Sequence, residues 1–325
     1  VAAGGLGGQP LHAAGGAGCR KVSVPHGWII LDKPIGLGST QAVAAVKRVF
    51  RQGGYGKVKV GHGGTLDPLA TGVLPIGVGE ATKLCGRMLD ASKAYAFTIR
   101  FGEQTDTLDL EGAVVAQSPV RPAMAELEAI LPRFTGPIDQ VPPAYSAILI
   151  DGQRAYDRAR AGEDVAMQSR RVTVFSLHID ADALRDADHV TLIAHVSKGT
   201  YIRSLARDIA LELGTVGHVT MLRRLKAGPF ALDRAISLDK LEEVAKGAPL
   251  ENILLPLEAA LVDIPALNLG PEQARAVRQG RVLAGLPQDD GLCWARTGSV
   301  PVALMEVSSG EARVVRGFNL PDVAE

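Results

Sequence analysis

Cysteine is scarce in this 325-residue chain, which contains only Cys19, Cys85 and Cys293. The three lie far apart and form no CxxC pair. The sequence therefore favours neither a disulfide framework nor a structural zinc site, and it fits a reducing compartment. A run of about 18 apolar residues, which a membrane-spanning helix requires, is also missing. These absences predict a protein of the cytoplasm that does not span a membrane.

Neither sign of charge is in excess, because 35 Lys and Arg balance 35 Asp and Glu. Aromatic residues are few, with two Trp, five Tyr and seven Phe. The apolar fraction of 46% and the charged fraction of 22% are ordinary for a globular protein, which excludes a disordered or fibrous chain. Any binding of nucleic acid must therefore depend on local clusters of basic residues.

Two such clusters are present. Residues 33–66 contain lysines and arginines but no acidic residue, and residues 197–226 carry six basic residues against Asp208 and Glu212. This pattern predicts a surface that faces phosphates. Two ordinary solvated faces would give the same pattern, so both interpretations stay open.

Composition changes twice along the chain. Residues 1–24 contain seven Gly and five Ala without any acidic residue, which predicts a flexible tail. Residues 233–263 are acidic and contain spaced prolines, as a linker would. Because a domain usually has roughly 100–200 residues, we predict a large domain over 25–255 and a small, mostly β domain over 256–325.

Hydrophobic periodicity predicts the elements of both domains. A helix capped by Ser39 or Thr40 carries Val43, Val46 and Phe50 on one face. The other expected helices span 122–133, 204–213 and 271–279, and the expected strands span 28–31, 95–101, 172–179, 190–196, 292–296, 300–307 and 313–318.

One glycine-rich stretch holds a carboxylate in a restrained place. Residues 61–72 read GHGGTLDPLATG, and the glycines allow the backbone to approach a ligand closely. Pro68 excludes helical geometry at Asp67, so the carboxylate lies on a stiff, extended turn. Such a carboxylate can act as a nucleophile or a base. A lone Asp-Pro turn that only caps a helix would give the same local sequence.

A second stretch, residues 197–203, reads SKGTYIR. In an extended chain Tyr201 and Arg203 share one face while Ile202 enters the core. An aromatic ring beside a guanidinium suits a planar or anionic ligand, although a strand edge with a surface arginine would have the same residues.

Several motifs occur in an order that resembles the TruB family of bacterial tRNA pseudouridine synthases. They are GWIILDKP at 27–34, GHGGTLDPLATG at 61–72, LPIG at 74–77, GEATK at 79–83, TDT at 105–107, PPAYSA at 142–147, GTYIR at 199–203 and LRRL at 222–225. Each motif is weak alone, and the ordered set is specific. The resemblance implies an enzyme that isomerises uridine 55 in the T loop of tRNA to pseudouridine.

The resemblance also implies roles for single residues. Asp67 matches the essential aspartate that attacks the target nucleoside, and Arg203 matches the arginine that pairs with it. Tyr95 matches the tyrosine that stacks on the flipped uracil and is a candidate for removing the proton from C5. Tyr201 matches a second aromatic residue of the active site, and Leu222 matches an apolar wall of the base pocket.

Three further residues match motif positions outside that group. His62 matches the residue that enters the T loop and takes the place of the extruded base. Lys33 and Lys83 match family lysines for which we expect structural rather than catalytic roles. The isomerisation involves no net oxidation or reduction and neither consumes nor releases water or phosphate. We therefore expect no cofactor and no metal. The implied partner is the T-stem loop of tRNA, with the protein acting as a monomer without an obligate protein partner.

The fold implied by the resemblance is α/β (α+β), with a central mixed sheet crossed by the active cleft. The C-terminal domain is similar to a PUA-type RNA-binding module. One departure is Leu149, which stands where the family usually has a lysine. Two alternatives stay open: an RNA-binding or tRNA-folding factor, and a pseudouridine synthase that depends on a guide RNA.

Overall fold

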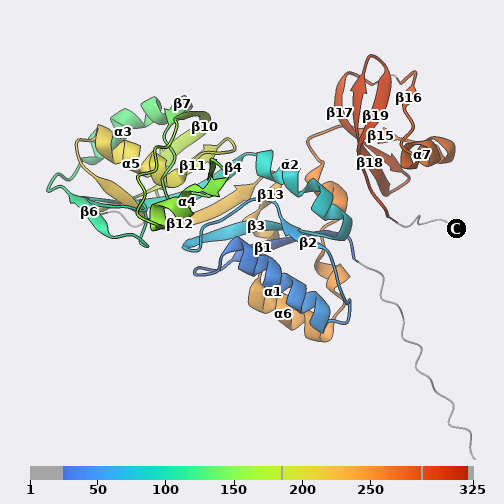
Figure 1. Cartoon of the computed structure of the whole chain (residues 1–325), viewed down its shortest axis with the longest axis horizontal. Coiled ribbons are helices and arrows are strands. Elements are labelled where there is room, and N and C mark those ends of the chain that lie inside the picture. The colour runs from blue at the N-terminus through green and yellow to red at the C-terminus, as the bar shows by residue number, and fades with distance from the viewer. Residues whose placement is uncertain (1–24, 184–185, 287, 321–325) are drawn as a thin grey trace, which may run out of the picture.

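The computed structural model describes residues 25–183, 186–286 and 288–320, and its two main sheets lie side by side in Figure 1. The larger sheet has ten strands and the smaller has five. The tail predicted for residues 1–24 lies outside the described residues. Among the helices of the described part, none is long and apolar enough to cross a membrane.

The large sheet is mixed, as the sequence predicts. Its strands run in the order β14 (Ile236–Ser237), β1 (Gly27–Lys33), β3 (Ala70–Val78), β12 (Gly217–Ala227), β4 (Lys93–Phe101), β11 (His189–Val196), β10 (Arg170–Ile179) and β7 (Gly136–Gln140), with β2 (Val60–His62) beside β3 and β13 (Phe230–Ala231) beside β12. The pairs β1–β14 and β3–β12 are parallel, and the other pairs are antiparallel. At the centre of the sheet, Leu222 of β12 lies opposite both Ala70 of β3 and Phe97 of β4.

Helices cover the sheet and bury its apolar side chains. They are α1 (Ser39–Gln52), α2 (Cys85–Asp90), α3 (Met124–Ile130), α4 (Ala155–Arg160), α5 (Ile202–Glu212) and α6 (Leu238–Gly247). In Figure 1, α1 and α6 lie together along β1 and β3. The predicted apolar face of α1, with Val43, Val46 and Phe50, is buried there. A second cluster forms where α5 and α3 pack on β4, β11 and β12.

Short turns and two hairpins connect these elements. The 3₁₀ turns are η1 (Gly79–Leu84), η2 (Leu131–Phe134), η3 (Leu232–Arg234), η4 (Leu250–Ile253) and η5 (Leu257–Ala260), and the hairpins pair β5 (Glu103–Thr105) with β6 (Val114–Gln117) and β8 (Leu149–Ile150) with β9 (Gln153–Arg154).

Three sequence predictions differ from the structure. Gly38, not Ser39 or Thr40, is the N-cap of α1, because the Ser39 hydroxyl bonds to the backbone of Leu66 instead of its own helix. The helix expected over 122–133 ends at Ile130 and continues as η2, where Pro132 is compatible with the tighter turn. Strand β12 was not predicted, since its Arg223 and Arg224 resemble surface residues.

The smaller sheet forms the C-terminal part of the chain, drawn in red in Figure 1. Its order is β15 (Ala266–Asn268), β17 (Gly291–Thr297), β18 (Val300–Ser308), β19 (Glu311–Gly317) and β16 (Leu283–Ala284), with α7 (Pro271–Arg278) packed on it. Its apolar edge shares one buried cluster with the large sheet, in which Trp28 and Phe230 join Trp294 and Phe318. The β-rich composition predicted for this part is therefore present.

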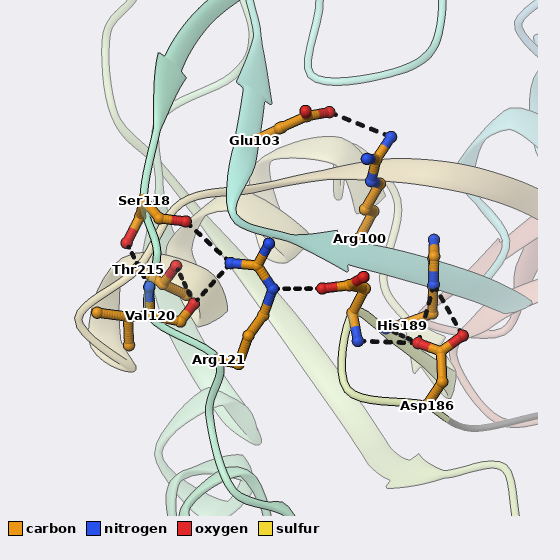
Figure 2. A network of polar contacts seen from close by, with 9 residues as sticks. Arg100, Glu103, Ser118, Val120, Arg121, Asp186, His189 and Thr215 are labelled. Atoms are coloured by element: carbon orange, nitrogen blue, oxygen red, sulfur yellow. Dashed lines mark hydrogen bonds and ion pairs between the residues drawn. The ribbon is translucent and has the colours of Figure 1, made fainter.

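A polar network fixes the base of the β5–β6 hairpin to the large sheet (Figure 2). Arg121 forms an ion pair with Asp188 just before β11 and donates to the carbonyl oxygens of Ser118 and Val120. Thr215 donates to the same Val120 carbonyl at 3.0 Å. The network thus joins the segment after β6 to the loops that precede β11 and β12.

Candidate active site

The predicted Asp67 loop connects β2 to β3, and side chains from distant elements hold its backbone. Arg224 of β12, only 1% exposed, donates to the Thr65 carbonyl at 3.0 Å and the Gly64 carbonyl at 3.4 Å. Ser39 of α1 donates to the Leu66 carbonyl at 3.0 Å and accepts from the Leu66 amide at 2.8 Å. The backbone on the N-terminal side of Asp67 is therefore fixed by two separate elements, β12 and α1.

The C-terminal side of the loop is held in the same way. The Gly36 amide donates to the Pro68 carbonyl at 2.8 Å, and the Lys33 ammonium lies 3.3 Å from the same oxygen. Lys33 is fully buried and also donates to the carbonyls of Pro34 and Leu37. Burial lowers the pKa of Lys33 to about 8. Its contacts are all with backbone oxygens of the two loops, which fits the structural role expected for it.

Asp67 meets Arg203, the pairing that the family resemblance implies. The Asp67 Oδ2 atom lies 3.0 Å from Nη2 of Arg203, and the Asp67 side chain is 44% exposed. Arg203 itself is buried and also forms an ion pair with Asp109 at 3.2 Å. Its guanidinium further donates to the carbonyls of Thr107 and Tyr145. A carboxylate that faces solvent is thus oriented by an arginine that two carboxylates and two backbone carbonyls hold in place.

One cavity of about 310 Å³ adjoins this ion pair. The structure brings five predicted residues together in its wall: Asp67, Tyr95, Tyr201, Arg203 and Leu222. They come from the loop before β3, from β4, from the start of α5 and from β12. The register of β12 between its two neighbours explains this convergence. Arg224 of β12 pairs with Tyr95 of β4 on one side and with Gly72 of β3 on the other, so β12 brings both strands to the cavity.

The local geometry around Tyr201 differs from the extended chain that the sequence predicts. Tyr201 is the N-cap of α5, and Ile202 and Arg203 begin the helix. The Tyr201 amide, which lies before the first helical turn, donates to the side-chain oxygen of Gln140 at 2.8 Å. Burial raises the pKa of the Tyr201 hydroxyl, so this group stays protonated at neutral pH.

Three predicted residues lie outside the cavity wall. His62 is half-buried on β2, opposite Ile76 of β3, and burial together with nearby Arg224 lowers its pKa. Lys83 donates to Glu80 at 2.6 Å and to the Gly317 carbonyl at 2.8 Å, so it joins η1 to the end of β19. Lys33 lies behind the Asp67 loop, as described above.

Three residues that support or line the site were not predicted from the sequence. Asp109 and Gln140 lie beside motifs that had been recognised, and their partners are more than 60 positions away. Lys93 lines the cavity, two positions before Tyr95 on the same face of β4. The predicted phosphate-facing cluster is partly wrong, because Arg203 and Arg224 are buried against loop carbonyls and carboxylates. Within that cluster, Arg223 pairs with Asp32 at 2.8 Å.

Comparison with known proteins agrees with this arrangement. The model of the TruB family pseudouridylate synthase N-terminal domain matches residues 47–202, and that of the tRNA pseudouridylate synthase B C-terminal domain matches residues 203–262. A curated tRNA pseudouridine synthase B from Novosphingobium aromaticivorans is 71% identical over 92% of this chain and 99% of its own length. That from Zymomonas mobilis is 58% identical over 90% and 96%.

Solved structures share the fold. A chain of the archaeal box H/ACA sRNP Nop10–Cbf5 complex superposes with a TM-score of 0.68 and 26% identity, covering 92% of this chain and 87% of that one. A Cbf5–Nop10–Gar1 complex gives 0.69 and 25%, covering 91% and 85%. The mixed sheet and the site at its centre are those of the pseudouridine synthase class. Within that class, the chain belongs to the TruB family.

Proposed function

We propose that this chain isomerises uridine to pseudouridine at position 55 in the T loop of tRNA. The observation that carries the proposal is the solvent-facing Asp67 carboxylate, 3.0 Å from the buried Arg203, at a cavity whose wall includes Tyr95 and Leu222. The 71% identity to a curated tRNA pseudouridine synthase B, against 24–26% to chains of H/ACA ribonucleoprotein complexes, supports a tRNA substrate.

The proposed reaction breaks the N1–C1′ bond, turns the uracil and forms a C5–C1′ bond. The proton on C5 is then removed and N1 takes up a proton, so that the product is an isomer of the substrate. The target base must first leave its stack, at a cost of a few kcal/mol. In this scheme Asp67 attacks the nucleoside, Tyr95 stacks on the flipped base and is the candidate for removing the C5 proton, and Leu222 provides the apolar wall. Tyr201 packs beside the base as a protonated tyrosine.

Three residues act outside the base pocket in this proposal. His62, near the Asp67 loop, fills the space that the base leaves in the T loop. Lys33 holds the Asp67 loop through the Pro68 carbonyl, and Lys83 holds the C-terminal domain through Gly317. No step requires a cofactor or a metal.

We assign residues 25–255 to the catalytic domain and 256–325 to a PUA-like RNA-binding domain. The separate five-stranded sheet of the second region supports the division. The substrate is the T-stem loop of tRNA, the protein acts as a monomer without an obligate partner, and its location is the cytoplasm, where tRNA is used.

The test is pseudouridine mapping in tRNA incubated with the purified chain alone. We expect complete conversion at position 55, no conversion by Asp67→Asn, and unchanged tRNA binding by that variant. Asp233→Asn, which alters an exposed acid in η3, is the matched control and should be fully active. Activity that appears only with added guide RNA would favour the guide-dependent alternative. Near-normal turnover by Asp67→Asn would refute the role of Asp67.

A further inference from the structure

Lys93 is a buried cation in the wall of the active cavity, and the reaction scheme above does not use it. Its residue is 7% exposed, and it lies on the same face of β4 as Tyr95. The ammonium donates to the carbonyl oxygens of Met88 (3.0 Å), Leu89 (2.6 Å) and Ala91 (2.6 Å), at the C-terminal end of α2. These three bonds use all three of its N–H groups and fix its position.

Arg224 lies beside Lys93 and is fixed in the same way. Its guanidinium donates to backbone carbonyls of the Asp67 loop and to Val73 at 2.7 Å. A Cβ atom placed on Gly64 would lie 3.6 Å from Nη1 of Arg224 and 4.0 Å from Cε of Lys93, so both side chains border the same glycine. The Lys93 and Arg224 side chains therefore both lie next to Gly64, in the loop that carries Asp67.

The charges of these two cations are not neutralised by a carboxylate. Arg203 has two ion pairs, with Asp67 and Asp109, whereas among the described residues neither Lys93 nor Arg224 forms one. Burial of an unpaired charge is unfavourable, and carbonyl dipoles offset only part of that cost. The three carbonyl bonds give the Lys93 ammonium a structural role at the end of α2, as similar bonds do for Lys33 beside the Asp67 loop. They give no reason for two uncompensated cations to lie together beside the active cavity.

The chemistry of the site gives such a reason. When the N1–C1′ bond breaks, its electron pair stays on N1, and the uracil carries one negative charge until C5 bonds to C1′. A fixed positive charge in a cavity with little water stabilises such an anion without reorganisation. We propose that Lys93, together with Arg224, provides this fixed charge and stabilises the detached uracil anion while it turns. The inference rests on the proposed function and adds to it.

Lys93 acts here through its charge, since its N–H groups are already bonded. Three charged groups face it: Arg224 from β12, Asp90 from α2 and Lys198 from the turn after β11. Burial and then Arg224 lower the pKa of Lys93 to about 8, while Asp90 has the opposite effect and is itself paired with Lys198 at 2.9 Å. Lys93 is therefore mostly protonated at pH 7, and it loses its proton at a lower pH than an exposed lysine does.

The experiment measures the single-turnover rate of isomerisation of bare tRNA, with enzyme in excess, between pH 6.5 and about pH 9.5. For Lys93→Met we expect a rate about 10- to 100-fold lower at pH 7, with tRNA affinity unchanged. Lys240→Met, which removes an exposed lysine of α6, is the control and should match the wild type. A Lys93→Met rate within twofold of wild type would overturn the proposal.

The pH profile provides a second measurement that folding alone does not produce. The wild-type rate should fall above about pH 8, and in Lys93→Arg, whose guanidinium keeps its charge, the fall should begin at least about one pH unit later. Coincident profiles of the two proteins would contradict the proposal. If neither variant folds, a wild-type rate that stays constant to pH 9.5 would contradict it. A wild-type chain that forms no pseudouridine at all would instead refute the proposed function.

Discussion

Ser39 and Leu66 are joined by two hydrogen bonds through one hydroxyl group. The Ser39 Oγ atom donates to the Leu66 carbonyl and accepts from the Leu66 amide, and both residues are buried. The first residue of α1 thereby fixes the peptide that directly precedes Asp67. The backbone beside Asp67 is therefore positioned by a residue of α1 and not by contacts within the loop itself.

We predict that Ser39→Ala lowers both stability and rate. Leu66 would keep a buried amide and carbonyl without their partner, which should cost about 1–3 kcal/mol in the free energy of unfolding. The rate of isomerisation should fall by about 10-fold because the carboxylate is less well positioned. Urea unfolding and single-turnover assays measure the two effects. Thr40→Ala, one position along on the exposed side of α1, should change neither, and an equal effect there would argue against the loop contact.

Arg203→Lys should slow the reaction while most of the fold survives. Arginine reaches Asp67, Asp109 and two carbonyls at once because its guanidinium is a planar fork, and an ammonium cannot reproduce this geometry. We expect a rate about 10- to 100-fold lower with little change in tRNA affinity. Rate constants within twofold of wild type would show that a point charge beside Asp67 is sufficient.

Gly72→Ala should prevent stable folding. Gly72 has φ +100°, and an added Cβ would lie 2.2 Å from the Arg224 carbonyl oxygen, which belongs to the backbone of the adjacent strand. The expected loss is at least about 3 kcal/mol. Gly136→Ala is the matched control, since Gly136 has φ +93° but no neighbour within 4 Å, and should cost only about 1–2 kcal/mol. Equal losses in thermal unfolding would contradict the clash.

Stability should depend on pH through Lys33. Burial lowers the pKa of Lys33 from 10.5 to about 8, so between these values the unfolded chain binds more protons than the folded one. The Lys33 contribution to the free energy of unfolding therefore rises as pH increases from about 8 to 10.5. Relative to Lys33→Met, which cannot titrate, the wild type should gain stability across this window. A difference between the two that stays constant with pH would rule out the effect.

Leu149→Lys tests the one clear departure from the family pattern. Leu149 is 58% exposed on the β8–β9 hairpin and lies outside the cavity wall. A lysine there adds one possible phosphate contact, so the slope of log affinity for tRNA against log salt concentration should become steeper by about 1. The single-turnover rate at saturation should not change. An unaltered slope would place the hairpin away from the RNA.

The sequence predicts the residues that face the cavity better than the buried residues that hold the Asp67 loop in place. Asp67 is recognisable because it lies in the GHGGTLDPLATG motif of the family, where Pro68 excludes helical geometry at Asp67. The burial of Arg224 is not, because the carbonyls that receive its hydrogen bonds belong to residues about 150 positions earlier in the chain. Its neighbours on β12 are basic, so local composition indicates a surface strand. Only the register of β12 between β3 and β4 places it inside.

The same limit applies to α5 and α1. Residues 197–203 contain a glycine and β-branched residues that favour an extended chain, yet the helix begins at Ile202, where Tyr201 bonds to Gln140 from a separate strand. Ser39 has the composition of a helix cap, yet its hydroxyl bonds to a loop 27 positions away. In both cases a tertiary contact prevails over a local preference, and such contacts cannot be read from one sequence.

Strand β3 has a consequence for the length of RNA that the protein can hold. The Asp67 loop precedes its first residue, and η1, which follows its last, carries the Glu80 and Lys83 contacts to Gly317 and Asn319. Nine residues of strand span roughly 30 Å. Because a strand hydrogen-bonded on both edges cannot stretch, this span acts as a rigid spacer. We expect a tRNA that reaches both Asp67 and the proposed RNA-binding domain to bridge this fixed distance.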